Sequence, residues 1–241
     1  MKVSINIAYW HTSEDRLTAL RFVLGKLSNF FFELKKENID FSFTIFDFSE
    51  TPKIEGGIHI PYPVSEYRRA EKLNHVIKYN CDNLCPDIFC LFDSDIFFDS
   101  ESYQVIIELI KNFDKKFFYV GYIFDLIFKG QVQLDLKNIQ LVGDFYPKKR
   151  DVFGLGGAFM IDFNELFDIG GYDENFITWG GEDDDLGNRL SRKGIKRKNL
   201  NARFYHLPHT HIQKIDWNQY KKQCELIMVH STFKPSKIIF G

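Results

Sequence analysis

The chain has 241 residues, of which 44% are hydrophobic and 27% charged. This balance is typical of a folded globular protein and excludes an intrinsically disordered one. The formal net charge of -2 argues against a broad nucleic-acid-binding surface, which would need an excess of Lys and Arg. The length lies within the range of one domain, so we expect a single domain over residues 1–241.

The cysteines and the apolar runs favour a reducing compartment. The four cysteines match no zinc-binding spacing, and Cys90 lies within an apolar segment, so buried free thiols are favoured. No apolar run reaches the roughly 18 residues that a membrane-spanning helix needs, and Met1-Lys2-Val3 leads directly into a strand pattern. We therefore expect a cytoplasmic protein; peripheral docking of a Phe-rich surface on the inner face of a membrane stays open.

The first half of the chain alternates strand and helix patterns. Helix starts are indicated by Ser13-Glu14-Asp15 and by Ser65, which is suited to cap a helix. The continuous apolar run 88–92 is typical of a strand covered on both faces. The predicted order is strand 3–9, helix 13–31, strand 41–48, helix 67–77, strand 88–92, helix 103–113 and strand 117–122. This order predicts the α/β class, with an open, mostly parallel sheet and helices on both faces.

The second half changes character. Residues 132–142 fit either a strand pair or an excursion from the sheet. The basic stretch 192–203 is interpreted as facing solvent or an anionic acceptor. The predicted elements are a strand at 158–161 after a Gly-rich segment, a short helix at 163–167, a helix from the acidic run 182–185 to Gly194, and a last helix at 217–229.

Asp93-Ser94-Asp95 closes the apolar run 88–92. In open α/β sheets, ligands bind beyond the carboxyl ends of the strands. Two carboxylates at such an end can share one divalent cation, which in turn bridges phosphate oxygens. The alternative is an ordinary Asp pair at a strand-to-turn junction, since Asp favours turns.

A second acidic segment, Glu182 to Asp185, follows Trp179-Gly180-Gly181. The dipole of a helix N-terminus stabilises one or two acids, whereas four in a row need a cation or a ligand as well. The glycines allow a close approach of a ligand, and a Trp face suits a sugar ring. A carboxylate held there could take a proton from a sugar hydroxyl. The two acidic segments together predict a metal-dependent enzyme that acts on a polyol or phosphate substrate.

Further candidates lie outside the acidic segments. His206 and His209 could complete a metal shell, and imidazole beside carboxylates suits Mn²⁺. Arg68-Arg69 could bind phosphate through forked hydrogen bonds, or could form a solvated helix face.

Four segments, in this order, resemble the GT-A-fold glycosyltransferases, specifically the β-1,4-galactosyltransferase-like group and its bacterial chondroitin-polymerase-type relatives. They are YRRAEKLN at 67–74, LFDSD at 91–95, the segment 156–174 from GGAF to GGYDE, and WGGEDDDLGNRL at 179–190. The last two form one block of about thirty-five residues and are the most specific. The resemblance implies a GT-A sheet with a nucleotide-sugar-binding half at 1–125 and an acceptor-binding, catalytic half at 126–241.

The resemblance also implies an activity. It is the inverting transfer of a hexose or N-acetylhexosamine from a UDP-sugar to a hydroxyl of a glycan or lipid-linked oligosaccharide, with Mn²⁺ or Mg²⁺, in bacterial surface polysaccharide synthesis. A departure at Gly154, where the animal enzymes carry a bulky aromatic residue, leaves space for an acetamido group, so UDP-GalNAc or UDP-GlcNAc is the expected donor.

The resemblance assigns roles to single residues as well. Asp183 would be the general base that deprotonates the acceptor. The other assignments are Asp95, Asp93, His206 and His209 for the metal, Arg69 for the diphosphate of the donor, and Trp179, Gly181, Glu182 and Asp184 for the acceptor sugar.

Two other functions compete with this one. A nucleotidyltransferase is disfavoured because no Gly-rich, Lys-bearing phosphate loop follows the first strand. A nucleotide-sugar- or glycan-binding module that has lost turnover is the remaining alternative. The presence of Asp93, Asp95, Asp183 and His209 argues against it.

Overall fold

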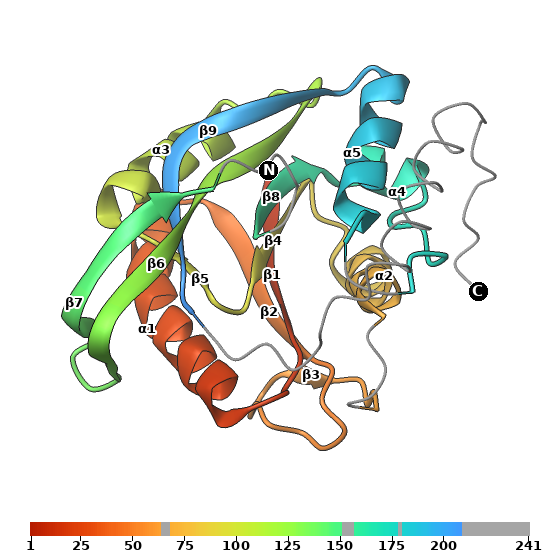
Figure 1. Ribbon diagram of the computed structural model, residues 1–241. Helices are drawn as coiled ribbons and strands as arrows, with labels where there is room; N and C mark the ends of the chain where they lie inside the picture. The colour runs from red at the N-terminus through yellow and green to blue at the C-terminus, as the bar shows by residue number, and fades with distance from the viewer. Residues whose placement is uncertain (64–67, 151–156, 178–179, 209–241) are drawn as a thin grey trace.

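The computed structural model describes residues 1–63, 68–150, 157–177 and 180–208 (Figure 1). Ser65, Gly154, Trp179, His209 and the helix predicted at 217–229 lie outside these ranges.

The described elements follow the predicted alternation in the first half. The helices are α1 (Glu14–Lys36), α2 (Arg69–Tyr79), the π-helical turn η1 (Asn80–Leu84), α3 (Ser100–Lys111), α4 (Phe163–Asp168) and α5 (Glu182–Lys193). The strands are β1 (Lys2–Tyr9), β2 (Asp40–Asp47), β3 (Ile58–His59), β4 (Ile88–Asp93), β5 (Ile96–Phe98), β6 (Phe117–Asp135), β7 (Gln140–Lys149), β8 (Ala158–Asp162) and β9 (Lys196–His206).

The nine described strands form one sheet in the order β3-β2-β1-β4-β8-β6-β9-β5, with β7 beside β6. Strands β3, β2, β1 and β4 are parallel, so their carboxyl ends lie at one edge. Strand β8 inserts between β4 and β6 and runs antiparallel to both, while β6 and β9 are again parallel. The α/β class is confirmed; the parallel order holds at the β3–β4 side, and the rest of the sheet is mixed.

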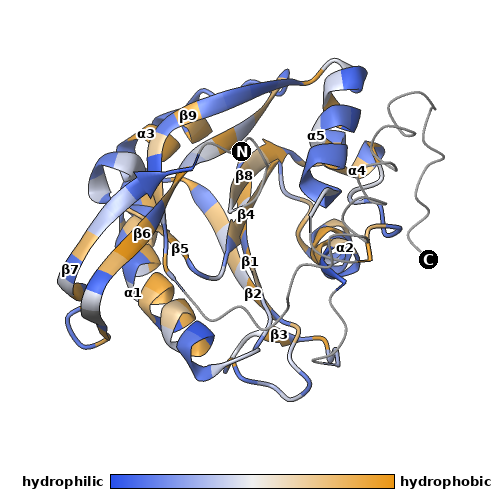
Figure 2. Ribbon diagram, in the orientation of Figure 1, coloured by the Kyte–Doolittle hydropathy of each residue, from blue (hydrophilic) through white to orange (hydrophobic). Residues whose placement is uncertain are grey.

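Helices cover both faces of the sheet (Figure 1). The sequence of β4 is apolar because both faces of the strand are buried. On one face, Ile88, Cys90 and Phe92 pack in the core with α1 and α3. Phe89 and Leu91 pack in the opposite core with α2, α4 and α5. Figure 2 shows the corresponding pattern, with hydrophobic residues along β4 and β8 and hydrophilic residues on the outer side of α5.

Several boundaries differ from the predicted ones for local reasons. Helix α3 begins at Ser100, before the expected position 103, because Asp99 caps it by accepting a 2.9 Å hydrogen bond from the Ser102 amide. Residues 132–142 belong to a β6–β7 hairpin. Of the two predictions for this segment, the strand pair is therefore correct, and the excursion from the sheet is not. Most of the basic stretch 192–203 lies in β9, where buried Leu200, Ala202 and Phe204 alternate with exposed polar residues.

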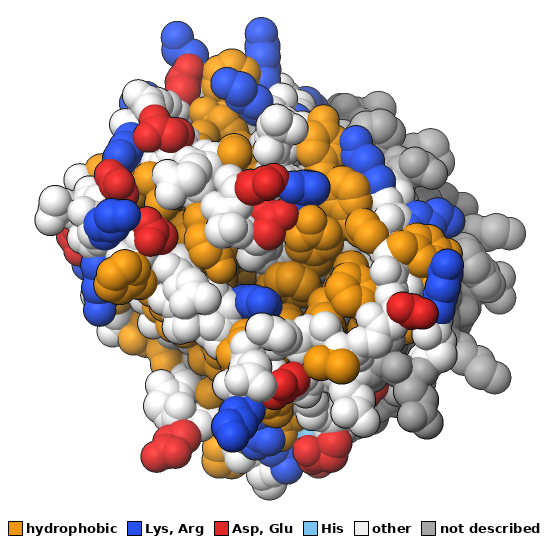
Figure 3. Space-filling model, turned by 90° about the vertical axis from the view of Figure 1, so that its left-hand side faces the viewer, with side chains coloured by type: hydrophobic (Ala, Val, Ile, Leu, Met, Phe, Trp, Pro, Cys, Tyr) orange, Lys and Arg blue, Asp and Glu red, His pale blue; other side chains and the backbone are white. Residues whose placement is uncertain are grey.

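The side of the molecule that carries α1, α3 and the β6–β7 hairpin mixes exposed apolar and charged side chains (Figure 3). Phe32, Val142 and Tyr146 are among its exposed apolar residues. A surface cavity of about 640 Å³ is lined by residues of α1 and α3 such as Lys26 and Tyr103. Among the described helices, none has the length and apolar character needed to cross a bilayer.

Gly121 in β6 permits the close packing of β9. A Cβ atom on Gly121 would lie 2.2 Å from Cδ2 of the buried Phe204 ring. Gly121→Ala should therefore lower the free energy of unfolding by about 1–3 kcal/mol, measured by urea denaturation. Adding Phe204→Leu should relieve the overlap, so the double variant should lose less stability than the sum of the single variants. Additive losses would show that this contact does not set the strand packing.

Candidate active site

One arginine brings the two acidic segments together. Arg69, the first residue of α2, donates from Nη1 to Glu182 Oε1 and to Asp183 Oδ2, both at 2.9 Å. Its Nη2 donates to Asp93 Oδ1 at 3.2 Å. The Arg69 side chain is only 16% exposed, so these ion pairs form in a largely desolvated place. The end of β4 and the start of α5 therefore meet at one cation.

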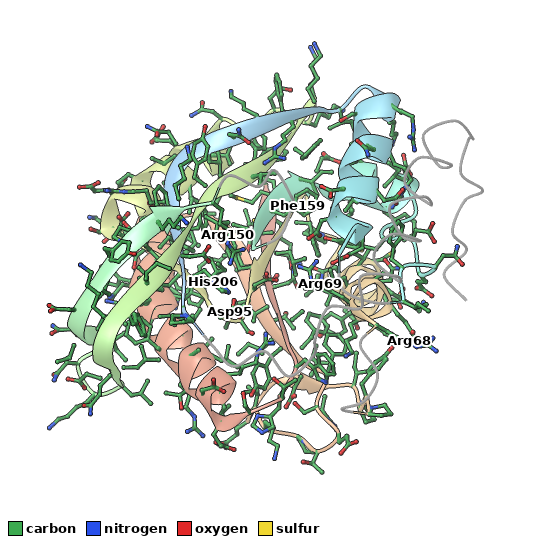
Figure 4. All side chains as sticks on the ribbon, in the orientation of Figure 1. Arg68, Arg69, Asp95, Arg150, Phe159 and His206 are labelled. Atoms are coloured by element: carbon green, nitrogen blue, oxygen red, sulfur yellow. The ribbon has the colours of Figure 1, made fainter. Side chains whose placement is uncertain are left out.

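Figure 4 shows the neighbouring arginines in opposite positions. Arg69 lies in the middle of the view with Asp95, His206 and Arg150, between α2 and the β6–β7 hairpin, whereas Arg68 lies at the outer side of α2. The Arg68 side chain is 51% exposed and pairs with Glu71 one turn along. Arg68 therefore belongs to a solvated helix face, as one of the two predictions for Arg68-Arg69 expected, whereas Arg69 contacts the acidic segments.

The start of α5 explains how four consecutive acids are tolerated. Gly181 caps the helix with a φ of 93°, a left-handed conformation that favours glycine. Asp185 turns into the core, where its carboxylate accepts a 2.7 Å hydrogen bond from Arg189 Nε. Asp184 lies on another side, near Arg197. The acids are therefore distributed over separate cations of the chain itself.

Asp183, the candidate base, has a shifted pKa. Burial raises the pKa of Asp183 to about 7; the Arg69 charge opposes this, and Glu182 and Asp93 raise the pKa further. Asp183 Oδ1 and Glu182 Oε2 are buried and have no hydrogen-bond partner among the described residues. Each can accept a hydrogen bond from a bound hydroxyl. A carboxyl group that titrates near neutral pH and has an unpaired oxygen suits general base catalysis.

Asp184 is the most exposed of the four acids at the start of α5. Burial raises its pKa, the Asp183 charge adds to this effect, and the Arg197 charge opposes it. Its carboxylate does not share Arg69 with the other two acids in the described contacts. Asp184 and Glu182, both expected to bind the acceptor, therefore lie on either side of Asp183 in different surroundings.

The second acid of Asp93-Ser94-Asp95 lies in a separate corner. Asp95 is 4% exposed, and its backbone carbonyl accepts a 2.9 Å hydrogen bond from the Leu207 amide. Strand β5 pairs with β9, with Ile96 opposite His206. This pairing brings His206 Nε2 to 3.7 Å from Asp95 Oδ1. Arg16 of α1 contacts the other carboxylate oxygen of Asp95 at 3.4 Å.

The corner offers part of a metal shell. Asp95 and His206 supply a carboxylate oxygen and an imidazole nitrogen, a donor set that suits Mn²⁺. No cluster of three or more His, Cys, Asp or Glu side chains poised for a metal occurs within the described ranges. His209, the further ligand that the resemblance implies, lies beyond the last described residue, Pro208.

Three contacts of this corner were not anticipated from the sequence. Arg16 reaches Asp95, and Asp125 of β6 lies 3.0 Å from His206 Nδ1. Arg150 donates to Asp125 from Nε at 2.9 Å and from Nη2 at 2.6 Å. A signal for Asp125 existed, since a lone carboxylate inside the apolar run Phe124-Asp125-Leu126 needs a partner. Arg16 carries no such signal, because it looks like any polar residue of an amphipathic helix.

The shifted pKa of Asp183 predicts a stability change. The pKa in the folded protein, about 7, exceeds the ordinary value of 3.8, so the folded state holds the proton more tightly than the unfolded state does. Folding stability should then fall as pH rises from about 4 through 7. Asp183→Asn removes this penalty, so it should be more stable than the wild type at about pH 8, by on the order of 1 kcal/mol or more.

The measurement is urea unfolding of both proteins at several pH values. The gain should shrink toward about pH 4, where Asp183 is protonated in both states. Asp168→Asn, at a side chain that is 68% exposed, should show no such gain. A wild type that is more stable than Asp183→Asn at every pH would contradict this account of the site.

Comparisons with known proteins found one matching family model and several similar solved structures. Residues 144–210 match the family model described as the N-terminal domain of galactosyltransferase. This segment contains strand β8, which follows a Gly-rich stretch of sequence, the acidic start of α5 and His206. A search of curated protein sequences found no match.

Solved structures show the same fold. The catalytic domain of Drosophila β1,4-galactosyltransferase 7, in complex with xylobiose, matches with a TM-score of 0.56 and 15% identity over 92% of this chain and 79% of that one. A mutant of that enzyme with manganese, UDP-Gal and xylobiose matches with a TM-score of 0.55, the same identity and the same coverage. GalNAc-T7 with UDP, GalNAc and Mn²⁺ matches with a TM-score of 0.57 and 12% identity over 93% of this chain and 48% of that one.

The comparisons confirm the predicted resemblance. This chain has the fold of the GT-A glycosyltransferases, and its segment 144–210 carries the sequence pattern of the galactosyltransferase family.

Proposed function

We propose that this protein is an inverting, metal-dependent glycosyltransferase that moves a hexose or N-acetylhexosamine from a UDP-sugar to a hydroxyl of a glycan or lipid-linked oligosaccharide. The observation that carries the proposal is the Arg69 cluster, which joins Asp93 at the end of β4 to Asp183 at the start of α5. A donor-side carboxylate and a candidate base therefore share one site. The GT-A fold and the structural neighbours that contain UDP-sugar, manganese and xylobiose support the same assignment.

The donor side of the site is the corner around Asp95. Asp95 and His206, with Asp93 and His209, are proposed to hold Mn²⁺, or Mg²⁺ in its place. When bound, such an ion stabilises the charge that develops on the departing UDP. Arg69 lies beside Asp93, so we assign it to the diphosphate side of the donor while it also holds the carboxylates of α5.

The acceptor side is formed by the start of α5. Asp183 is proposed to take the proton of the acceptor hydroxyl, which makes the hydroxyl oxygen more nucleophilic. This oxygen attacks the anomeric carbon from the face opposite to the leaving UDP. Because the sugar is attacked from that face, the configuration at the anomeric carbon inverts. Glu182 Oε2, unpaired among the described residues, can bind a second acceptor hydroxyl. Asp184, Gly181 and Trp179 complete the proposed acceptor site.

The identity of the donor sugar is proposed from a single position of the sequence. By the resemblance of the sequence, Gly154 replaces the bulky aromatic residue that the animal enzymes carry near the 2-position of the donor, so we propose UDP-GalNAc or UDP-GlcNAc. We also propose that the reaction belongs to bacterial surface polysaccharide synthesis. The competing function is a glycan- or nucleotide-sugar-binding module without turnover. One observation favours it, namely that Arg69 pairs with the candidate base directly.

A panel of UDP-sugars, incubated with and without Mn²⁺ and read by release of UDP, separates the two functions. We expect release that requires the metal and is fastest with an N-acetylhexosamine donor. Asp183→Asn should reduce transfer to an acceptor by about 10²–10⁴-fold while UDP binding stays nearly intact, since the base acts only in the chemical step. Asp95→Ala should instead weaken nucleotide-sugar binding measured with Mn²⁺ present.

The matched control is Arg68→Met, an exposed neighbour of the site that should keep full transfer activity. Binding of UDP-sugars without any release, with every donor and either metal, would identify a binding module. Exclusive use of UDP-Gal would refute the donor assignment alone, and an equal loss of UDP binding and transfer in Asp183→Asn would refute the role of the base.

A further inference from the structure

Four side chains form a continuous chain of contacts from the β6–β7 hairpin to the Asp95 corner. Arg150, which follows β7, makes hydrogen bonds to both carboxylate oxygens of Asp125, two at 2.9 Å and one at 2.6 Å. Asp125 Oδ1 lies 3.0 Å from His206 Nδ1. The other ring nitrogen of His206, Nε2, lies 3.7 Å from Asp95 Oδ1. Figure 4 shows Arg150, His206 and Asp95 along one line of the view.

A local irregularity of the sheet creates this alignment. Strands β6 and β9 pair Gly121 with Leu200, but the next pair is Tyr122 with Arg203. A regular parallel register would place Phe204 opposite Asp125; the shift places His206 there instead. Such bulges commonly re-aim a side chain next to an active site. The irregularity of β9 therefore has a chemical result: it pairs the carboxylate of β6 with the imidazole of β9.

The shorter of the two carboxylate contacts favours the tautomer of neutral His206 that carries its hydrogen on Nδ1. An ionised carboxylate is only an acceptor, so Nδ1 donates to Asp125. In neutral imidazole the hydrogen on Nδ1 leaves the lone pair on Nε2. That lone pair faces the Asp95 carboxylate at a distance longer than a hydrogen bond. Two electron-rich groups in this arrangement are suited to share a cation.

We propose that Asp125, held by Arg150, is a positioning residue that fixes His206 with Nε2 directed at the cation bound by Asp95. The inference rests on the metal site of the proposed function and adds a residue that no comparison assigns. Asp125 itself is not a ligand, because both of its oxygens are engaged by the Arg150 guanidinium. A carboxylate behind a metal-binding histidine orients the ring and increases its basicity, and its loss typically weakens metal affinity 10–100-fold.

The test compares Asp125→Asn and Asp125→Ala with Asp144→Asn, a control at an exposed carboxylate of β7 in the same hairpin. The first readout is titration calorimetry with Mn²⁺ alone. We expect about 10–100-fold weaker binding in Asp125→Ala, a smaller loss in Asp125→Asn, whose amide oxygen still accepts from Nδ1, and no change in Asp144→Asn.

The second readout needs no metal. Two-bond ¹⁵N–¹H correlations of the metal-free protein, with the His206 signals assigned by comparison with His206→Gln, should show the Nδ1–H form in the wild type when the ring is neutral. Asp125→Ala should shift the ring toward the Nε2–H form, whereas a merely structural role of Asp125 would leave the tautomer unchanged. Urea unfolding confirms that each variant is folded.

The outcomes separate this inference from the proposed function. If the wild type binds Mn²⁺ and Asp125→Ala binds it within twofold with the same tautomer, Asp125 has no positioning role, while the glycosyltransferase assignment stands. If the wild type binds no Mn²⁺, the metal site of the proposed function fails and this inference fails with it. Weaker metal binding together with a changed tautomer supports both.

Discussion

The candidate site depends on one partly buried cation among carboxylates. Arg69 binds Asp93 on one side and Glu182 and Asp183 on the other, and these residues come from β4 and α5, far apart in the sequence. Without the guanidinium, the carboxylates of Asp93, Glu182 and Asp183 would repel one another, most strongly where Glu182 and Asp183 are shielded from water. The same contact holds the candidate base close to the donor side of the site. The Arg69 side chain therefore connects the end of β4 with the starts of α2 and α5 and also contacts the candidate base.

The topology of the sheet also brings together the residues of the Asp95 corner. Its parallel strands β1, β2 and β4 end at the same edge, which delivers Asp93 and Asp95 there. The short strand β5 then reverses against β9 and brings His206 back to Asp95. The shifted register of β6 and β9 adds Asp125 behind the imidazole. The parallel half of the sheet thus supplies Asp93 and Asp95, and the mixed half supplies His206 and Asp125.

The elements that were predictable are those whose signal is local. The apolar run 88–92 forms β4, the helix predicted at 67–77 forms α2, and the helix predicted from the acidic run forms α5. The insertion of β8 between β4 and β6 was not predictable, because strand order depends on long-range pairing. The contacts of Arg69 with three carboxylates also arise from tertiary packing. The role of Arg16 had no sequence signal, whereas Asp125, a charge within an apolar strand, had one that could have been followed.

A double-mutant cycle between Arg69 and Asp183 tests the central ion pair most directly. The free energies of unfolding of the wild type, Arg69→Met, Asp183→Asn and the double variant at about pH 8 give the coupling energy of the pair. The structure predicts a coupling of about 1–3 kcal/mol, and a coupling near zero for the matched cycle with the exposed Arg68 in place of Arg69. If Arg69 couples to Asp183 no more strongly than Arg68 does, the two acidic segments do not meet at this cation and the assignment of a shared site is wrong.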